Sequence, residues 1–339
     1  MSELVWDQSE LARQLWQSYG LSVVSAQLVG AGVSTARWLV ACPGRRVMVV
    51  QYLSADAADA ARPGLDMHEL CRAAHVAAPR VLTGSDGGLL TTTSLGRCSV
   101  TWALTGPELQ LPLQAAQAQH LGMNLAFLHR ATAAYPPVTE HPRPPEARWY
   151  ATPLDQVLAS TDAAARSIPL RSRDDRRRLD GYLTALHTHL LPRVPGLRAE
   201  VGHDRLVVHA VHGAYLPRNL YPIVGSVPRV TGFAARTAHL AWEIARIAYH
   251  PRTVAHSQRW LDSAAALLVA YHRTRPGLPG RDLLASARIA VLQLLTNPPL
   301  GASLSVWSTR ITTLRRLLGH LPRIDAVVQD AAGLPLRPT

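Results

Sequence analysis

The sequence predicts an α+β protein built from two parts. Residues 1–106 form a small antiparallel β-rich part with a leading helix, and residues 107–335 form a larger, mainly helical part with a short β island. Two observations lead to this prediction. Short strand-like runs separated by turn residues fill the first part, and apolar residues at helical spacing fill the second. The 339 residues and their 47% hydrophobic content are sufficient for a substantial core.

The first part begins with an amphipathic helix over residues 4–19, which places Leu11 and Leu15 on its apolar face. A second helix is expected over 64–75. The Pro43–Gly44 pair predicts a hairpin turn between two apolar runs. The strand-like runs cover residues 22–30, 36–42, 45–53, 80–83, 89–95 and 98–106. We expect them to form a five-stranded antiparallel sheet.

In the second part the apolar residues take on a helical period. Residues 112–130 place Leu121, Leu125 and Leu128 on one face. A proline-rich connector at 136–145 leads to a helix whose inward side carries leucines and whose outer side carries arginines. That helix covers 174–191, a β-rich island follows at 205–234, and the remainder to about residue 330 is helical.

The chain is strongly basic. Its formal net charge is +12, and all 35 basic residues are arginine, so no lysine is present for any chemistry. Such a protein attracts anions, which include acidic peptides and phosphate groups. No basic motif interleaved with aromatic residues and no zinc knuckle occurs, and we therefore do not expect nucleic acid as a partner.

The sequence lacks signals for membranes and for oxidising compartments. No apolar stretch is long enough to cross a bilayer, and the N-terminal residues lack an export pattern, so we expect a cytoplasmic protein without a membrane partner. Cys42, Cys71 and Cys98 lie far apart with no CxxC pair. This spacing predicts neither a disulfide framework nor a zinc site.

The most specific pattern is LVVHAVHGAYLPRNL at residues 206–220, where His212 and Gly213 follow an apolar run and Asn219 ends a short polar loop. Three other segments accompany it in a fixed order: GAGVSTARWLV at 30–40, LAFLHR at 125–130 and AWEIAR at 241–246. Together they resemble the aminoglycoside-phosphotransferase and choline-kinase family over roughly residues 12–300. The resemblance implies a protein-kinase-like two-lobed fold with a small antiparallel β N-lobe and a larger helical C-lobe.

The chain departs from this family at the positions that carry phosphoryl transfer. The family's catalytic aspartate falls on Ala214, and its metal-binding aspartate falls on Gly232, or on Thr231 if the alignment shifts by one residue. The phosphate-binding lysine falls near Gln51, and its acidic partner has Asp66 or Glu69 as candidates. The resemblance therefore implies a pseudokinase.

Two of these losses do not depend on the alignment. The chain has no lysine, and no aspartate or glutamate occurs between Asp204 and Glu243. Phosphoryl transfer depends on neutralising charge with Mg²⁺ and on positioning the phosphates. We therefore predict no cofactor, no bound metal and no binding of ATP with Mg²⁺.

Several side chains of these loops have more than one interpretation. His212 and His209 could act as acid or base, or His212 could hold the loop by hydrogen bonds to the backbone. Asn219 is expected to brace the loop or to contribute to ligand binding. The candidate residues for an anionic ligand in the interlobe cleft are Asn219, Arg218, Arg236, Arg45 and Arg46. The arginines at 171–178 are either a solvated face or a docking patch for an acidic segment.

Three functions fit these observations. The first is a non-catalytic protein that binds a peptide, a partner protein or an anionic ligand, and that assists modification of Ser and Thr residues in a peptide biosynthetic pathway. The second is a repurposed enzyme on the same fold, for elimination or thiol addition on a modified peptide. The third is an atypical ATP-dependent phosphotransferase that acts on a hydroxylated small molecule or peptide.

Overall fold

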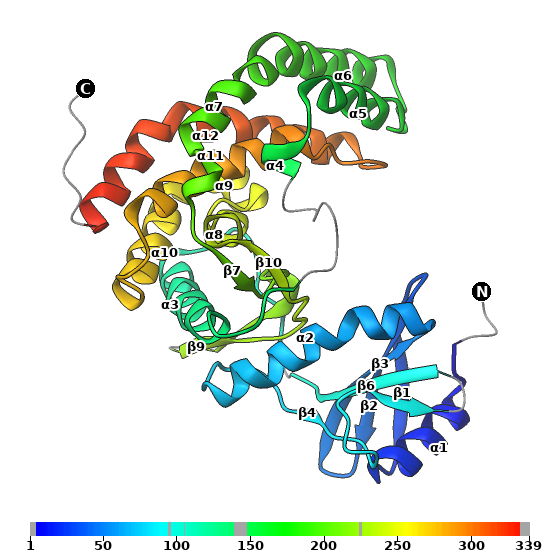
Figure 1. Cartoon of the computed structure of the whole chain (residues 1–339). Helices are drawn as coiled ribbons and strands as arrows, with labels where there is room; N and C mark the ends of the chain where they lie inside the picture. The colour runs from blue at the N-terminus through cyan, green and yellow to red at the C-terminus, as the bar shows by residue number, and fades with distance from the viewer. Residues whose placement is uncertain (1–4, 94–95, 105, 139–147, 224–225, 333–339) are drawn as a thin grey trace. The chain divides into compact units, whose positions relative to one another are not determined.

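The structure, a computed structural model, describes residues 5–93, 96–104, 106–138, 148–223 and 226–332. The chain divides into two compact units (Figure 1). The first unit comprises Met1–Leu109, Ala131–Val138 and His212–Arg236, and the second comprises Gln110–Arg130, Thr139–Val211 and Thr237–Thr339.

The segment His212–Arg236 belongs to the first unit, although the sequence placed it with the helical part over 107–335. Backbone hydrogen bonds explain this assignment. The N–H of Val230 donates to the carbonyl oxygen of Ala77 at 2.8 Å, and the N–H of Leu109 donates to that of Leu220 at 2.8 Å. These bonds join the segment to residues 77 and 109 of the first part. Periodicity along the sequence cannot indicate contacts between segments so far apart.

The first unit contains a twisted antiparallel sheet in the order β1-β2-β3-β6-β4, with β5 also paired to β6. Among the described residues it has six strands, so the prediction of five was wrong. The two short runs after α2 both form strands, and each pairs with a different stretch of β6. The strands are β1 (Ser25–Ala31), β2 (Thr35–Cys42), β3 (Arg45–Tyr52), β4 (Val81–Leu82), β5 (Thr91–Thr93) and β6 (Gly96–Trp102).

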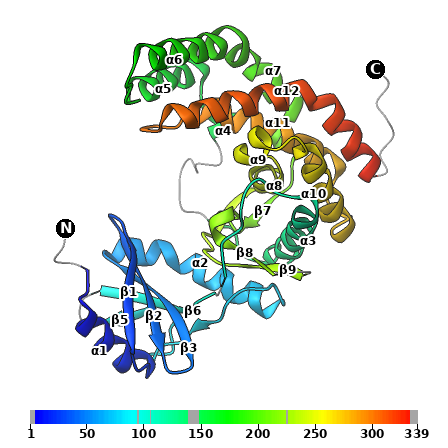
Figure 2. The same ribbon diagram turned by 180° about the vertical axis from the view of Figure 1, so that it is seen from behind.

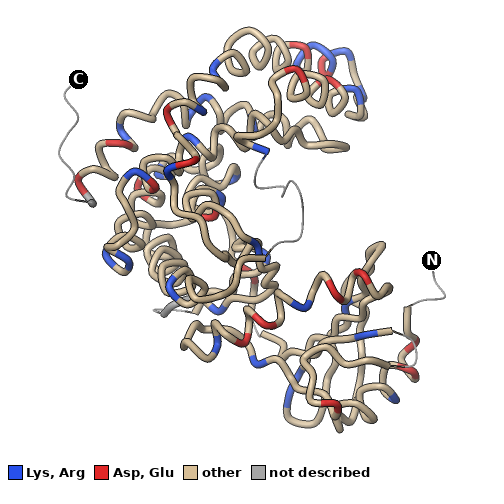
Figure 3. Tube along the Cα trace, viewed as in Figure 1, with Lys and Arg blue, Asp and Glu red and all other residues tan. Residues whose placement is uncertain are grey.

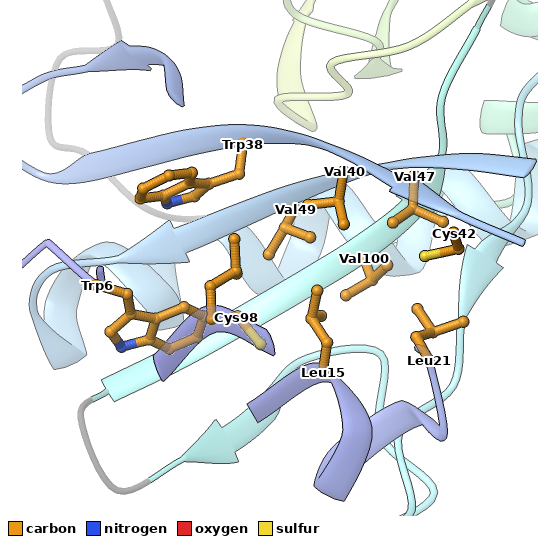
Figure 4. Close-up of a cluster of buried hydrophobic side chains, with 11 residues drawn as sticks. Trp6, Leu15, Leu21, Trp38, Val40, Cys42, Val47, Val49, Cys98 and Val100 are labelled. Atoms are coloured by element: carbon orange, nitrogen blue, oxygen red, sulfur yellow. The ribbon is translucent and has the colours of Figure 1, made fainter. Parts of the chain in front are cut away.

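One face of this sheet packs against α1 (Gln8–Tyr19). Alternate residues of neighbouring strands lie on this face because the register pairs Trp38 with Val49 and Val49 with Val100. Leu15 of α1 and Trp6 complete a continuous apolar cluster with them (Figure 4). The helix begins at residue 8 rather than 4, since Asp7 caps it by accepting a hydrogen bond from the N–H of Glu10 at 2.8 Å.

The other face of the sheet packs against α2 (Ala55–Ala73) through a cluster that includes Tyr52, Ala58 and Leu65. The sequence predicted this helix over 64–75, but Ser54 caps an earlier start at residue 55. Pro63 lies inside the helix, where a proline usually interrupts the hydrogen-bond ladder. Burial of the first helical turns against the sheet outweighs this local cost.

The second unit is mainly helical, as the sequence predicted (Figure 1). Leu121, Leu125 and Leu128 are buried, which confirms the apolar face expected for residues 112–130. The helices α11 and α12 run side by side in both views (Figures 1 and 2). The helices are α3 (Ala115–Thr132), α4 (Arg148–Ala151), α5 (Leu154–Arg166), α6 (Arg173–Ala185), α7 (Val194–Val201), α8 (Leu240–Ala248), α9 (Pro251–His256), α10 (Trp260–Thr274), α11 (Gly280–Thr296) and α12 (Leu304–Ala332).

The β-rich island forms two small sheets. β7 (Val208–Val211) pairs with β10 (Arg236–His239), both labelled in Figure 1, and β8 (Leu220–Ile223) pairs antiparallel with β9 (Ser226–Val230), both labelled in Figure 2. The island thus extends five residues beyond the 205–234 that the sequence predicted.

Charged residues of both signs are mixed at the start of α6 (Figure 3). Arg177 pairs with Asp174 at 2.6 Å, and both side chains are exposed. Over the part of the chain that the structure describes, no helix has both the length and the apolar character required to span a membrane.

Candidate functional site

His212 follows β7 at the point where the chain turns into the loop that contains Asn219. Its side chain is completely buried. Nδ1 accepts a hydrogen bond from the N–H of Ala214 at 3.1 Å, and Nε2 donates to the carbonyl oxygen of Thr231 at 3.1 Å. An imidazole that accepts at one nitrogen and donates at the other is neutral. His212 therefore closes the loop, and both ring nitrogens are already engaged.

Asn219 ends the short turn η5 (Pro217–Asn219) and also hydrogen-bonds to the loop itself. Its side-chain Nδ2 donates to the carbonyl oxygen of Ala214 at 2.8 Å, and its backbone carbonyl oxygen accepts from the N–H of Thr231 at 3.0 Å. These two bonds link Asn219 to Ala214 and to Thr231. The side chain of Asn219 thus braces the segment that the family resemblance assigns to catalysis.

Gly232, the position that the resemblance assigns to a metal-binding aspartate, lies against Asn219. Its φ of +70° is in the left-handed region that favours glycine. A Cβ atom at this position would lie 2.6 Å from Oδ1 and 2.7 Å from Cγ of Asn219. Real Cβ atoms do not approach other heavy atoms this closely, so an aspartate here requires Asn219 to move.

Phe233 connects this loop to α2. Its ring stacks on His68 at a centroid distance of 4.7 Å and contacts the ring of His212 in a tilted arrangement at 4.3 Å. The approach is possible because Gly64 lacks a Cβ, which would lie 2.3 Å from the carbonyl oxygen of Phe233. His68 is itself fixed by a 2.7 Å hydrogen bond with the carbonyl oxygen of Pro79, and burial lowers its pKa.

His68 was not among the residues that the sequence pointed to. Gly64 and His68 are four residues apart, so they lie on the same face of α2. A small residue followed one turn later by a ring is the signal that could have indicated a close approach of another segment. The partner segment itself, residues 231–234, could not be identified without the tertiary structure.

Gln51 lies on the face of the sheet that α1 covers. It is fully buried, and Oε1 accepts a hydrogen bond from the N–H of Trp6 at 3.2 Å. Because side chains alternate along a strand, Val50 and Tyr52 point instead to the face that packs against α2. Gln51 therefore does not face the helix that carries Asp66 and Glu69. Glu69 accepts from the N–H of Val81 at 3.1 Å and pairs with Arg72.

Gly30 lies near the end of β1, and Gly32 lies in the turn between β1 and β2, where its N–H donates to the carbonyl oxygen of Thr35 at 2.8 Å. Arg45 and Arg46 begin β3 after the Pro43–Gly44 turn, at the other end of β2, and both are exposed. The eight residues of β2 separate the two turns by about 26 Å. The two arginines are thus not gathered around the glycine turn.

The other two arginines lie near the loop. Arg218 is exposed within η5. Arg236 is half-buried, and its Cγ would lie 2.9 Å from a Cβ at Gly213, whose φ is +79°. Arg236 therefore packs over the glycine that follows His212. The structure thus brings together Gly213, Ala214, Asn219, Gly232 and Arg236, all within the first unit.

His209 has surroundings of its own in the second unit. Nδ1 donates to the carbonyl oxygen of Ala210 at 2.6 Å, and Nε2 accepts from Arg275 at 3.2 Å. Burial, assisted by the neighbouring His129, lowers the pKa of His209 to about 4. As with His212, both ring nitrogens have hydrogen-bond partners.

Two of the segments that suggested the family meet in the second unit. His129, from LAFLHR, donates through Nε2 to Glu243, from AWEIAR, at 3.1 Å. Nδ1 of His129 accepts from the hydroxyl of Tyr271 at 2.8 Å. The side chains of His129 and Glu243 are fully buried, and burial lowers the pKa of His129. This pair holds α3 to α8, so its role is structural.

The residues around the loop do not fit a magnesium–nucleotide site. Mg²⁺ prefers carboxylate oxygens, yet the two positions that the resemblance assigns to aspartates hold Ala214 and Gly232, and Nδ2 of Asn219 donates to the carbonyl oxygen of Ala214. Among the described residues, no group of three or more His, Cys, Asp or Glu side chains is arranged to hold a metal ion.

No protein-family model matches the sequence, and a search of curated proteins finds no match. Solved structures do match over almost the whole chain. An aminoglycoside phosphotransferase from Alicyclobacillus acidocaldarius is 16% identical with a TM-score of 0.58, covering 97% of each chain. A choline/ethanolamine kinase family protein from Mesorhizobium loti is 15% identical with a TM-score of 0.56, covering 95% of this chain and 99% of its own.

A third structure, spectinomycin phosphotransferase in complex with ADP and spectinomycin, is 10% identical with a TM-score of 0.55 and covers 96% of this chain and 99% of its own. At these identities the likeness establishes the fold. The chain thus has the kinase-like α+β fold of the aminoglycoside phosphotransferases and the choline and ethanolamine kinases, as the resemblance of its motifs predicted.

Proposed function

We propose that this chain is a kinase-fold protein that binds a ligand or partner and does not transfer phosphate from ATP. The observation that carries the proposal is the contact between Gly232 and Asn219. A Cβ at position 232, which the resemblance assigns to a metal-binding aspartate, would lie 2.6 Å from Oδ1 of Asn219, whose amide hydrogen-bonds to Ala214. Losing one preorganised electrostatic group commonly lowers a rate by about 10²–10³, and here the lysine and both aspartates are absent together.

The nature of the bound partner follows from charge. With a net charge of +12 and only arginine as the basic residue, the chain favours an anionic ligand, an acidic peptide or an acidic partner protein. A role in modifying Ser and Thr residues of a peptide is the biosynthetic setting that the family resemblance suggests. The geometry favours this binding role over acid–base catalysis, because His212 and His209 use both ring nitrogens in hydrogen bonds.

A thermal-shift measurement with ATP and Mg²⁺ tests the central point. A ligand at about one hundred times its Kd stabilises a protein by about 2.7 kcal/mol, which raises Tm by several degrees. We expect no Mg²⁺-dependent rise for the wild type. We also expect none for Ala214→Asp, because the second aspartate position is still closed by Asn219. A Mg²⁺-dependent rise, together with consumption of ATP in the presence of a hydroxylated acceptor, would contradict the proposal.

A further inference from the structure

A pocket of about 880 Å³ lies within the second unit, between α6, α9, the end of α11 and the start of α12. Its volume is in the range of small-molecule sites. The lining includes apolar side chains such as Tyr182 and Leu294, and it also includes Arg178, Arg252 and Arg310. None of the residues proposed for the kinase-like loop contributes to it.

Arg310 is the unusual member of this lining. Only 4% of the residue is exposed. Nη1 donates to the carbonyl oxygen of Asn297 at 3.1 Å and Nη2 to that of Leu295 at 3.4 Å, both at the C-terminal end of α11. Nε is buried and has no hydrogen-bond partner among the described residues.

No carboxylate of the described chain forms an ion pair with Arg310, and its other neighbour is the ring of Trp307 at 5.6 Å. Burial lowers the pKa of Arg310 to about 9. A buried cation without a counter-charge is unfavourable, and carbonyl dipoles compensate it only in part. An anion that enters the pocket would supply the negative charge that Arg310 lacks.

The groups around Arg310 also favour a negatively charged ligand. Arg178 and Arg252 add two exposed cations from α6 and α9, whereas the lining contains a single carboxylate, Asp175, which already accepts from the N–H of Arg171 at 3.1 Å. The pocket also includes the first turns of α12, a long helix whose first turn has no acidic side chain. The N-terminal end of a helix attracts anions through its free N–H groups.

We propose that this pocket binds a small organic molecule that carries an oxyanion, either a phosphate ester or a carboxylate. The oxyanion lies near Arg310, Arg178 and Arg252, and the organic part contacts Tyr182 and Leu294. The site is separate from the loop around Gly232. A test of this site therefore does not depend on whether the chain transfers phosphate.

Isothermal titration with inorganic phosphate and with citrate, at constant ionic strength set with sodium chloride, tests this site. We expect saturable binding of at least one of the two anions at millimolar concentration. Binding of phosphate alone indicates a phosphate ester as the ligand, and binding of citrate alone indicates a carboxylate. If neither anion binds, the proposal is wrong.

Substitutions locate the binding. Arg252→Gln and Arg178→Gln should each weaken it by about tenfold, as expected for the loss of one charge-assisted contact. Arg177→Gln is the matched control, because it removes the same charge from the neighbouring position on α6, where Arg177 pairs with Asp174 outside the pocket lining.

Equal weakening by Arg177→Gln and Arg178→Gln would show that only the overall positive charge attracts the anions, which overturns the proposal. Arg310→Met removes the buried cation itself and should abolish binding. If that variant does not fold, the two exposed arginines still decide the question. The Mg²⁺-dependent ATP measurement remains a separate readout, since it reports on the first unit.

Discussion

At the scale of single residues, Asn219 and Gly232 determine what the degenerate loop can do. The amide of Asn219 both donates to Ala214 and fills the space beside Gly232, whose backbone is left-handed at φ +70°. A side chain at position 232 therefore has to displace the amide of Asn219 and also adopt a left-handed backbone.

We predict that Gly232→Asp destabilises the first unit by about 1–3 kcal/mol, because it combines a left-handed aspartate with a close contact to Asn219. Urea unfolding measures the change in free energy. Gly181→Ala in α6 is the control, since a Cβ there meets no atom within 4 Å. It should stabilise the chain by about 0.5–1 kcal/mol, as expected for glycine inside a helix. An unchanged stability of Gly232→Asp would show that the loop rearranges freely.

At the scale of elements, α2 and the segment 231–234 form one packed arrangement. Gly64 allows the backbone of Phe233 to approach the helix, and the ring of Phe233 stacks on His68 and contacts the tilted ring of His212. The N–H of Ala234 donates to the carbonyl oxygen of His212 at 2.9 Å, which joins the two ends of the loop. The position of the loop therefore depends on a helix more than 140 residues earlier in the sequence.

We predict that Gly64→Ala costs about 1–3 kcal/mol, the usual range for overpacking a well-filled contact. The methyl group would lie 2.3 Å from the carbonyl oxygen of Phe233, and that atom belongs to backbone that cannot rotate away. Hydrogen exchange should become faster at Ala234 in this variant. The control Gly319→Ala in α12, where a Cβ meets no atom within 4 Å, should leave that amide protected. Equal exchange in both variants would refute the proposed contact.

At the scale of the whole molecule, the chain contains several histidines that folding keeps neutral. Burial lowers the pKa values of His68, His129 and His239, and it lowers those of His209 and His250 to about 4. In the unfolded chain the pKa of each of these histidines is about 6.5. Below that pH the unfolded chain therefore binds more protons than the folded one.

We predict that stability is highest above about pH 6.5 and falls as the pH decreases from there towards about 4. Each excess proton bound by the unfolded chain contributes up to about 1.4 kcal/mol per pH unit. Urea unfolding at about pH 7.5 and about pH 5 measures the loss. A free energy of unfolding that is constant between these two conditions would contradict the burial of neutral histidines.

The kinase-like fold was predictable from the sequence, because each motif is local. The apolar period of residues 112–130 and the Pro43–Gly44 turn each reflect spacing within a few residues. The His212–Gly213 pair is recognisable as a short pattern, although His212 also bonds to Thr231, 19 residues away. The strand count and the start of α2 were not predicted correctly. The sequence contains a strand-like run at each of β4 and β5, but strands of two and three residues are too short for periodicity to show how many separate strands the sheet has. The early start of α2 depends on packing against the sheet.

The candidate site was predictable in its losses but not in its geometry. The absence of lysine and the interval without carboxylates between Asp204 and Glu243 are facts of composition, and no fold can alter them. The face on which Gln51 lies depends on strand register, which a shift of one residue reverses. The contact between Asn219 and Gly232 depends on how two segments of the loop meet in space.

The sequence by itself thus determined the kinase-like fold, the absence of lysine and the interval without carboxylates, because these depend on residue types and local spacing. Only the tertiary structure decided that Asn219 lies against Gly232, that His212 is held by backbone groups on both sides, and that Arg310 is buried beside a pocket. Burial and hydrogen-bond partners arise from contacts between residues far apart in the chain, and the order of residues does not specify them individually.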